Sequence, residues 1–76
     1  MDITIISRDM YEKHSENPNF KRVCKNADKV ANRDGINVQV YYDKLRREYF
    51  WIDCYDNHKF NKVPKCNVIC EICFVD

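Results

Sequence analysis

The sequence predicts a small α+β fold, formed as a single domain over residues 1–76 with the element order β-α-α-β-β-β. Two patterns support this prediction. Apolar residues recur at helical spacing in residues 18–34, whereas residues 36–42 alternate apolar and polar side chains as a strand does. We expect a mainly antiparallel sheet with the helices packed on one face. A chain of 76 residues buries only about 60% of its unfolded surface, so one thin core must stabilise it.

The N-terminal segment is expected to form a strand and then a short helix. Residues 2–6 read DITII and are rich in β-branched side chains, which favour strands. Ser7 can cap a helix over residues 8–16, with Asp9 in the first turn, where the helix dipole favours an acid. The chain should therefore enter the fold as a strand followed directly by a helix.

The second helix is the best-defined element of the sequence. Asn17 and Pro18 suit its N-cap and first position, and the lone glycine, Gly35, suits its C-cap. One stripe is apolar and consists of Phe20, Val23, Cys24, Ala27, Val30 and Ala31. The opposite side is basic and carries Lys21, Arg22, Lys25, Lys29 and Arg33, with Asp28 among them. We expect the apolar stripe to be buried and the basic side to face solvent.

Three further strands are expected in the second half of the chain. Residues 36–42 and 47–55 should pair as a hairpin, residues 58–65 should form a loop closed by Pro64, and residues 66–75 should form the last strand. The first of these strands should direct one set of side chains to the core, namely Ile36, Val38, Val40 and Tyr42. The second should do so with Phe50, Ile52 and Cys54. Its other face should carry Tyr49, Trp51, Asp53 and Tyr55.

The composition is typical of a soluble globular protein, with 45% hydrophobic residues, 33% charged residues and a net charge of +1. So small a net charge creates no field over the whole molecule that would attract nucleic acid or anionic lipid. Residues 1–14 contain no apolar run long enough for a secretion signal or a membrane span, so we expect a cytoplasmic protein without a membrane partner. Frequent Asn, Lys, Ile and Tyr with scarce Gly and Ala indicate an AT-rich genome, as in many phages and some bacteria.

The cysteines raise the question of a metal site. Cys66, Cys70 and Cys73 have the spacing C-x3-C-x2-C, and Cys54 with His58 could complete a zinc site. A strand over residues 66–75 would instead direct Cys73 to the face opposite Cys66 and Cys70. Buried, reduced thiols are therefore the favoured interpretation, with a zinc site of Cys54, His58, Cys66 and Cys70 as the alternative. We expect no cofactor.

Catalytic signatures are missing from the sequence. No serine stands in a nucleophile elbow, and one glycine in total makes a phosphate-binding loop improbable. His14 and His58 lie far apart in the chain, although a pair of His58 with Cys54 or Cys66 remains an alternative. We therefore predict a protein that is not an enzyme.

The strongest functional signal is a set of aromatic residues on the sheet face that the helices should leave uncovered. Tyr, Trp and Arg are enriched in interface hot spots. The expected binding residues are Tyr41, Arg47, Tyr49, Trp51 and Tyr55. These residues predict a small regulator or inhibitor that binds a protein partner, and the exposed rings also favour a homodimer with Trp51 near the two-fold axis. The alternative interpretation is that the rings only pack against one another, or are covered by the loop at residues 57–65 or by the first helix.

A second functional class uses the same rings to stack the bases of single-stranded nucleic acid. Phosphate contacts would then come from the basic side of the second helix, at Lys21, Lys25, Lys29 and Arg33. The alternative interpretation of this basic patch is an ordinary solvated helix surface.

Overall fold

The computed structural model describes residues 2–74, and its elements follow the order β-α-α-β-β-α-β. They are β1 (Asp2–Ile5), α1 (Arg8–His14), α2 (Pro18–Asp34), β2 (Val38–Asp43), β3 (Glu48–Asp53), α3 (Cys54–Phe60), the 3₁₀ turn η1 (Lys65–Asn67) and β4 (Val68–Cys73). The four strands form one antiparallel sheet against which helices pack. The predicted α+β class with an antiparallel sheet is therefore confirmed.

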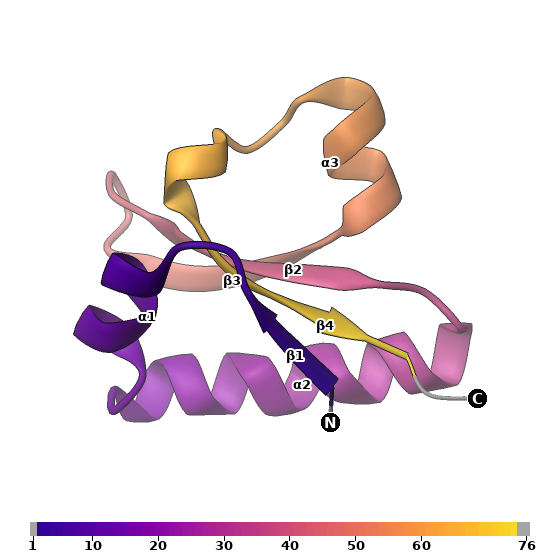
Figure 1. Ribbon diagram of the computed structural model, residues 1–76, viewed down its shortest axis with the longest axis horizontal. Coiled ribbons are helices and arrows are strands. Elements are labelled where there is room, and N and C mark those ends of the chain that lie inside the picture. The colour runs from indigo at the N-terminus through magenta and orange to yellow at the C-terminus, as the bar shows by residue number, and fades with distance from the viewer. Residues whose placement is uncertain (1, 75–76) are drawn as a thin grey trace.

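The strands lie in the order β1-β4-β2-β3, so the last strand of the chain occupies an inner position of the sheet. Strand β4 pairs antiparallel with both β1 and β2, which makes β1 and β2 parallel to each other across it (Figure 1). Strands β2 and β3 form the predicted hairpin, with Tyr41 opposite Phe50. Strands β1 and β3 are the two edges of the sheet.

The first two helices begin as the sequence predicts. The Ser7 side chain accepts a hydrogen bond from the Met10 amide at 3.3 Å at the start of α1, and Asn17 accepts one from the Asn19 amide at 2.8 Å at the start of α2. At the end of α2, Gly35 takes a left-handed conformation with φ of 65°, which is favourable for glycine because it has no Cβ. Helix α1 ends two residues earlier than predicted, at His14.

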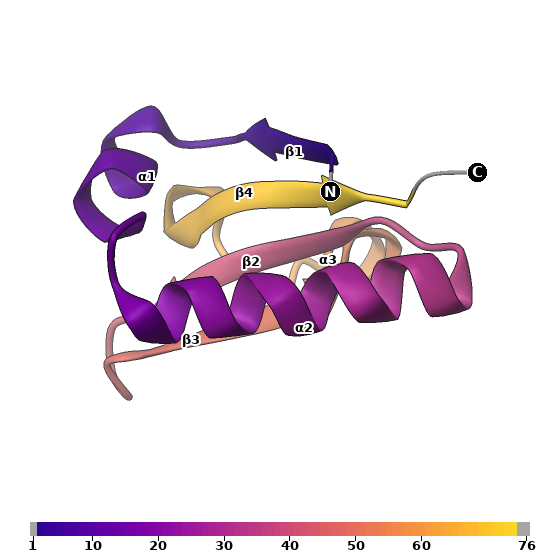
Figure 2. The same cartoon turned by 90° about the horizontal axis from the view of Figure 1, so that it is seen from below.

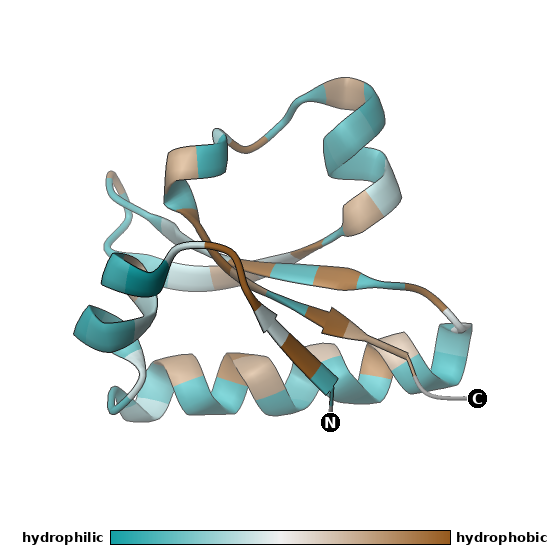
Figure 3. Cartoon of the chain, viewed as in Figure 1, coloured by the Kyte–Doolittle hydropathy of each residue, from teal (hydrophilic) through white to brown (hydrophobic). Residues whose placement is uncertain are grey.

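Helix α2 covers one face of the sheet and forms the core with it. It packs against β2, β3 and β4, and Figure 2 shows it running lengthwise beside β2 and β3. The core consists of Phe20, Cys24, Ala27, Ala31, Val38, Val40, Tyr49, Ile69, Cys70 and Ile72. In Figure 3 apolar and polar bands alternate along the strands as well as along α2. Among residues 2–74 no helix has both the length and the apolar character needed to cross a bilayer.

The third helix, α3, was not predicted. Strand β3 ends at Asp53, and the Asp53 side chain caps α3 by accepting a hydrogen bond from the Tyr55 amide at 2.8 Å. The helix ends at Asn61, in a left-handed conformation with φ of 52°. The residues predicted as the end of a strand and the start of a loop are helical because both caps are present. Helix α3 lies on the side of the sheet opposite α2 (Figures 1 and 2).

The last strand is shorter than predicted. Residues 65–67 form the turn η1, and β4 begins at Val68 and ends at Cys73. The pairing of β4 with β2 shifts register between Val40 and Tyr41, which places Val68 opposite Tyr41. Residue 75, at the predicted end of this strand, lies outside the described residues.

Candidate functional site

The side chains of β3 point to the opposite faces of the sheet from those predicted. Val40 is buried under α2 and pairs with Trp51. Because directly paired residues share a face, Trp51 and Tyr49 lie on the side that α2 covers, and Phe50 lies on the other side with its partner Tyr41. The prediction was wrong because β3 carries large apolar side chains on both faces. Alternation alone could not show which of them meets the core.

The five expected binding residues therefore do not form one surface. Tyr49 is 9% exposed and belongs to the core, while Trp51 is 40% exposed on the edge strand β3. Arg47 lies in the turn between β2 and β3 with φ of 56°. The structure brings only Tyr41 and Tyr55 to the side of the sheet that holds α3. Among residues 2–74, these side chains do not form the continuous patch of rings on which the expected dimer interface was based.

Buried Tyr49 contacts a histidine that sequence reasoning left aside. His14, the last residue of α1, lies 2.5 Å from the Tyr49 hydroxyl through Nδ1, and its ring stacks on Tyr42 at 4.8 Å. Burial, and then the charge of Lys13, lowers the pKa of His14. Burial, and then Tyr42, raises the pKa of Tyr49, so both members of the pair are held neutral. The residues around His14 in the sequence do not indicate this pairing, because Tyr49 lies 35 residues away and only the tertiary fold brings the two side chains together.

The side of the sheet that holds α3 carries a different set of rings. Tyr41 and Phe50 lie with ring centroids 5.9 Å apart, and the Arg46 guanidinium lies 5.7 Å from the centroid of Phe50. Burial, followed by the charge of Asp43, raises the pKa of Tyr41, so this phenol stays protonated at neutral pH. A cation packed over a ring in this way makes a favourable and orienting contact.

Helix α3 extends this arrangement away from the sheet. Tyr55 and Phe60 are 67% and 58% exposed. The Lys59 ammonium lies 5.8 Å from the Tyr55 centroid and 5.4 Å from the Phe60 centroid, and Lys62 lies 5.4 Å from Phe60. No residue of α3 is buried, so this helix contributes little to the core. We call the rings and cations of this side the α3-side face, which consists of Tyr41, Arg46, Phe50, Tyr55, Lys59, Phe60 and Lys62.

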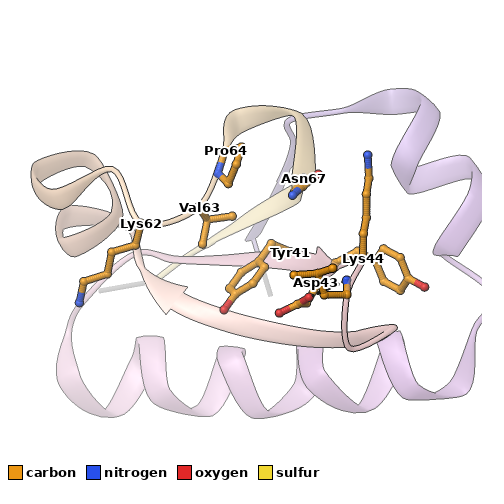
Figure 4. Close-up of a pocket in the computed structure, with 9 residues that line it drawn as sticks. Tyr41, Asp43, Lys44, Lys62, Val63, Pro64 and Asn67 are labelled. Atoms are coloured by element: carbon orange, nitrogen blue, oxygen red, sulfur yellow. Dashed lines mark hydrogen bonds between the residues drawn. The ribbon is translucent and has the colours of Figure 1, made fainter.

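A small cavity of about 240 Å³ connects the two parts of this face. Figure 4 shows Val63 lying over Tyr41, while the Lys62 and Lys44 side chains point away from each other at its two ends. Pockets that bind small molecules usually measure about 300 to 1,000 Å³. The volume of this cavity lies below that range.

A polar network holds α3 and the segment after it against the sheet. Asn57 donates to Gln39 at 2.8 Å, Gln39 donates to Glu71 at 3.2 Å, and the Val63 amide donates to Asn57 at 2.7 Å. The Cys54 thiol also donates to Glu71, at 3.2 Å. Burial first, and then this bond to Glu71, raises the pKa of Cys54 to about 11. Cys54 is therefore a protonated hydrogen-bond donor at neutral pH and a poor nucleophile.

The structure does not bring together the four residues of the alternative zinc site, Cys54, His58, Cys66 and Cys70. Cys70 lies in the core beneath α2, Cys54 lies on the side of α3, and Cys66 is exposed in η1. Cys66 is not part of a strand, so the expectation that it shares a face with Cys70 was wrong. Over the described range 2–74, no three Cys, His, Asp or Glu side chains are arranged to hold a metal ion.

The predicted basic patch is exposed on α2, at Lys21, Lys25, Lys29 and Arg33. Arg33 forms an ion pair with Asp34 at 2.9 Å, and Lys21 forms one with Glu16 at 3.4 Å. The patch lies on the side of the sheet opposite the α3-side face. The rings of that face and these lysines therefore lie on opposite sides of the sheet.

Comparisons with known proteins provide no functional assignment. No protein-family model matches the chain, and no curated protein or solved structure matches it significantly.

Proposed function

We propose that the protein is a non-enzymatic regulator that binds a protein partner through the α3-side face. The observation that carries this proposal is the character of α3, a seven-residue helix with no buried residue and with Tyr55 and Phe60 exposed beside lysines. A helix that buries none of its own rings leaves them available for contact. Aromatic residues and Arg are the types enriched at the centre of protein interfaces.

The charges of this face indicate the kind of partner. Arg46, Lys59 and Lys62 each pack over a ring, and every cation–π contact found among residues 2–74 involves one of them. The rings offer apolar area while the cations surround it. A partner surface with an apolar centre and an acidic rim would be complementary to this arrangement.

Two features support a role without catalysis. The Cys54 thiol is protonated by virtue of its raised pKa, and His14 is buried against Tyr49 rather than open to a substrate.

A site-specific photocrosslinking experiment tests the proposal. A photoreactive phenylalanine analogue replaces Phe60 in one sample and Trp51, on the other face, in the matched control. We expect one defined protein to crosslink at position 60 and not at position 51. Purified partner should then bind the wild type at least about tenfold more tightly than Tyr55→Ala/Phe60→Ala, because hot-spot rings carry much of the binding energy. Equal binding by both proteins would refute the proposal.

Single-stranded nucleic acid is a second candidate for the same face. The rings flanked by cations favour it, since bases stack on exposed aromatic residues and Arg or Lys contact phosphates. Labelled RNA and DNA titrated at about 50 and 200 mM salt separate the two candidates, because nucleic-acid affinity falls steeply with salt. Strong binding at low salt that Phe60→Ala abolishes would favour this candidate over a protein partner.

A further inference from the structure

The outer edge of β1 is open. Along residues 2–74, β4 is the one strand that pairs with β1. The Ile6 amide donates to the Ile69 carbonyl at 3.0 Å, and residues of an antiparallel strand alternate between bonding their neighbour and pointing away from it. The backbone N–H and C=O groups of Ile3 and Ile5 therefore point away from β4. An edge with such free groups is a template for a further strand.

An apolar groove of about 460 Å³ runs beside this edge, between β1 and the first two helices. Its walls include Ile3, Tyr11, Phe20 and Cys24. Ile3 and Ile5 face the same side of the sheet as the core residues Ile72 and Cys70, with which they pair, yet they are 39% and 38% exposed. Helix α2 thus leaves the β1 end of this face partly uncovered.

The rim of the groove is basic. Lys21 and Lys25 line it from α2, and Lys29 follows one turn further along the helix. Glu16 also lines the groove and pairs with Lys21 at 3.4 Å. Within the described part of the chain Lys25 has no ion-pair partner. A ligand that fills the apolar floor and carries negative charge would therefore be complementary to the groove.

We propose that this edge and groove bind an extended acidic segment of a partner protein, which adds a fifth strand beside β1. Ile3 and Ile5 would supply the backbone hydrogen bonds. On the side of the groove, the segment would place an apolar residue on the floor and an acidic residue next to it near Lys21 and Lys25. Addition of a strand to an open edge is a common mode of peptide recognition. This surface lies on the face opposite α3 and is independent of the function proposed above.

Charge distinguishes this occupant from a second copy of the chain. Two β1 strands paired about a two-fold axis would bring the lysine rims of both copies into one cleft, where like charges repel. An acidic segment meets no such repulsion. The apolar floor and the free backbone groups match a peptide better than a phosphate backbone.

The test uses a capped peptide of about seven residues in which threonines alternate with isoleucine and glutamate, so that one side carries both apolar and acidic groups. Its binding to the 76-residue chain is followed by calorimetry and by amide chemical shifts. We expect shifts in β1 and the first half of α2. Lys21→Glu/Lys25→Glu should weaken binding about tenfold or more, because attraction becomes repulsion. The matched pair Lys59→Glu/Lys62→Glu, on the other face, should leave affinity within about twofold.

A backbone test addresses the added strand directly. Ile5→Pro removes an N–H group that points away from β4, so the sheet should persist while peptide binding is lost. If this variant fails to fold, two peptides N-methylated on alternate residues provide the same test. One set of methyl groups should abolish binding and the other should not, since only one edge of the peptide faces β1.

Several results would overturn the proposal. These are the absence of saturable binding, equal binding by both N-methylated peptides, and shifts confined to the α3-side face. Displacement of the peptide by an oligothymidylate of equal charge would identify the groove as a nucleic-acid site instead. Dimerisation of the free protein that Ile5→Pro abolishes would identify a second copy as the occupant. Loss of peptide binding in Tyr55→Ala/Phe60→Ala would show that the two surfaces are not independent.

Discussion

His14 at the end of α1 and Tyr49 in β3 form a buried neutral pair whose Nδ1 and hydroxyl oxygen lie 2.5 Å apart. The pair connects the first helix to the edge strand of the sheet, across 35 residues of sequence. Phe20 packs edge-on against the same tyrosine at 5.6 Å. Tyr49 therefore serves stability and is unavailable for partner binding.

Stability should fall as the pH drops below about 6.5. Burial lowers the pKa of His14 from its ordinary value of 6.5, so the unfolded chain takes up a proton in a pH range where folded His14 stays neutral. This contribution to stability is fully present above about pH 6.5. It decreases as the pH falls and is lost once the pH is below the lowered pKa of folded His14. Each unit of pKa depression corresponds to about 1.4 kcal/mol.

Urea unfolding at several pH values between about 5 and 7.5 measures this dependence. His14→Phe, which keeps a ring beside Tyr42, should flatten the curve. Lys13→Gln removes a nearby positive charge that lowers the pKa of His14. The stability that this variant loses on acidification should therefore be equal to or smaller than the loss in the wild type. A wild-type curve no steeper than that of His14→Phe would show that His14 does not carry the effect.

Gly35→Ala should destabilise the protein by about 1 kcal/mol. The left-handed φ of 65° strains a residue with a Cβ, and no atom lies within 4 Å of the added group, so the backbone rather than a clash accounts for the loss. Gly35→Asn should lose less, because Asn tolerates this conformation better. Thermal unfolding of the three proteins checks the order, and equal stability of Ala and Asn variants would contradict it.

Asn57→Ala should loosen α3 without unfolding the sheet. The side chain bonds both Gln39 and the Val63 amide, and its removal leaves partly buried polar groups unpaired, at about 1–3 kcal/mol. Hydrogen exchange should accelerate in residues 54–63 far more than in α2. Asn26→Ala, an exposed position on α2, is the matched control and should change neither.

Cys66 should react first with a thiol reagent. It is exposed, whereas Cys24 and Cys70 are buried and Cys54 has its pKa raised to about 11. Burial first, and then the charge of Glu71, also raises the pKa of half-buried Cys73. Mass spectrometry after a short iodoacetamide pulse at neutral pH should find one label, on Cys66, and Cys66→Ser should remove this fast reaction. Rapid labelling of Cys54 in the native protein would contradict its role as a protonated donor to Glu71.

Local chemistry in the sequence determined the helices α1 and α2 and the strands of the hairpin. Asn17 with Pro18 defines the start of α2, Gly35 defines its end, and the spacing of its apolar residues defines its buried side. These features depend on near neighbours in the chain, which is why the sequence alone predicts them. The helix α3 was predictable in principle from its caps at Asp53 and Asn61, but the alternating residues before it favoured a longer strand.

Tertiary structure alone decided which surfaces are open. Strand β3 is apolar on both faces, so only its register with β2 shows that Tyr49 is buried and Phe50 lies on the side of α3. The insertion of β4 between β1 and β2 leaves β1 as an edge, and the network from Asn57 to Glu71 places α3 over the other face. Each of these contacts joins residues far apart in the chain. Periodicity reports only local geometry, so it could not show which rings, lysines and strand edges would share a surface.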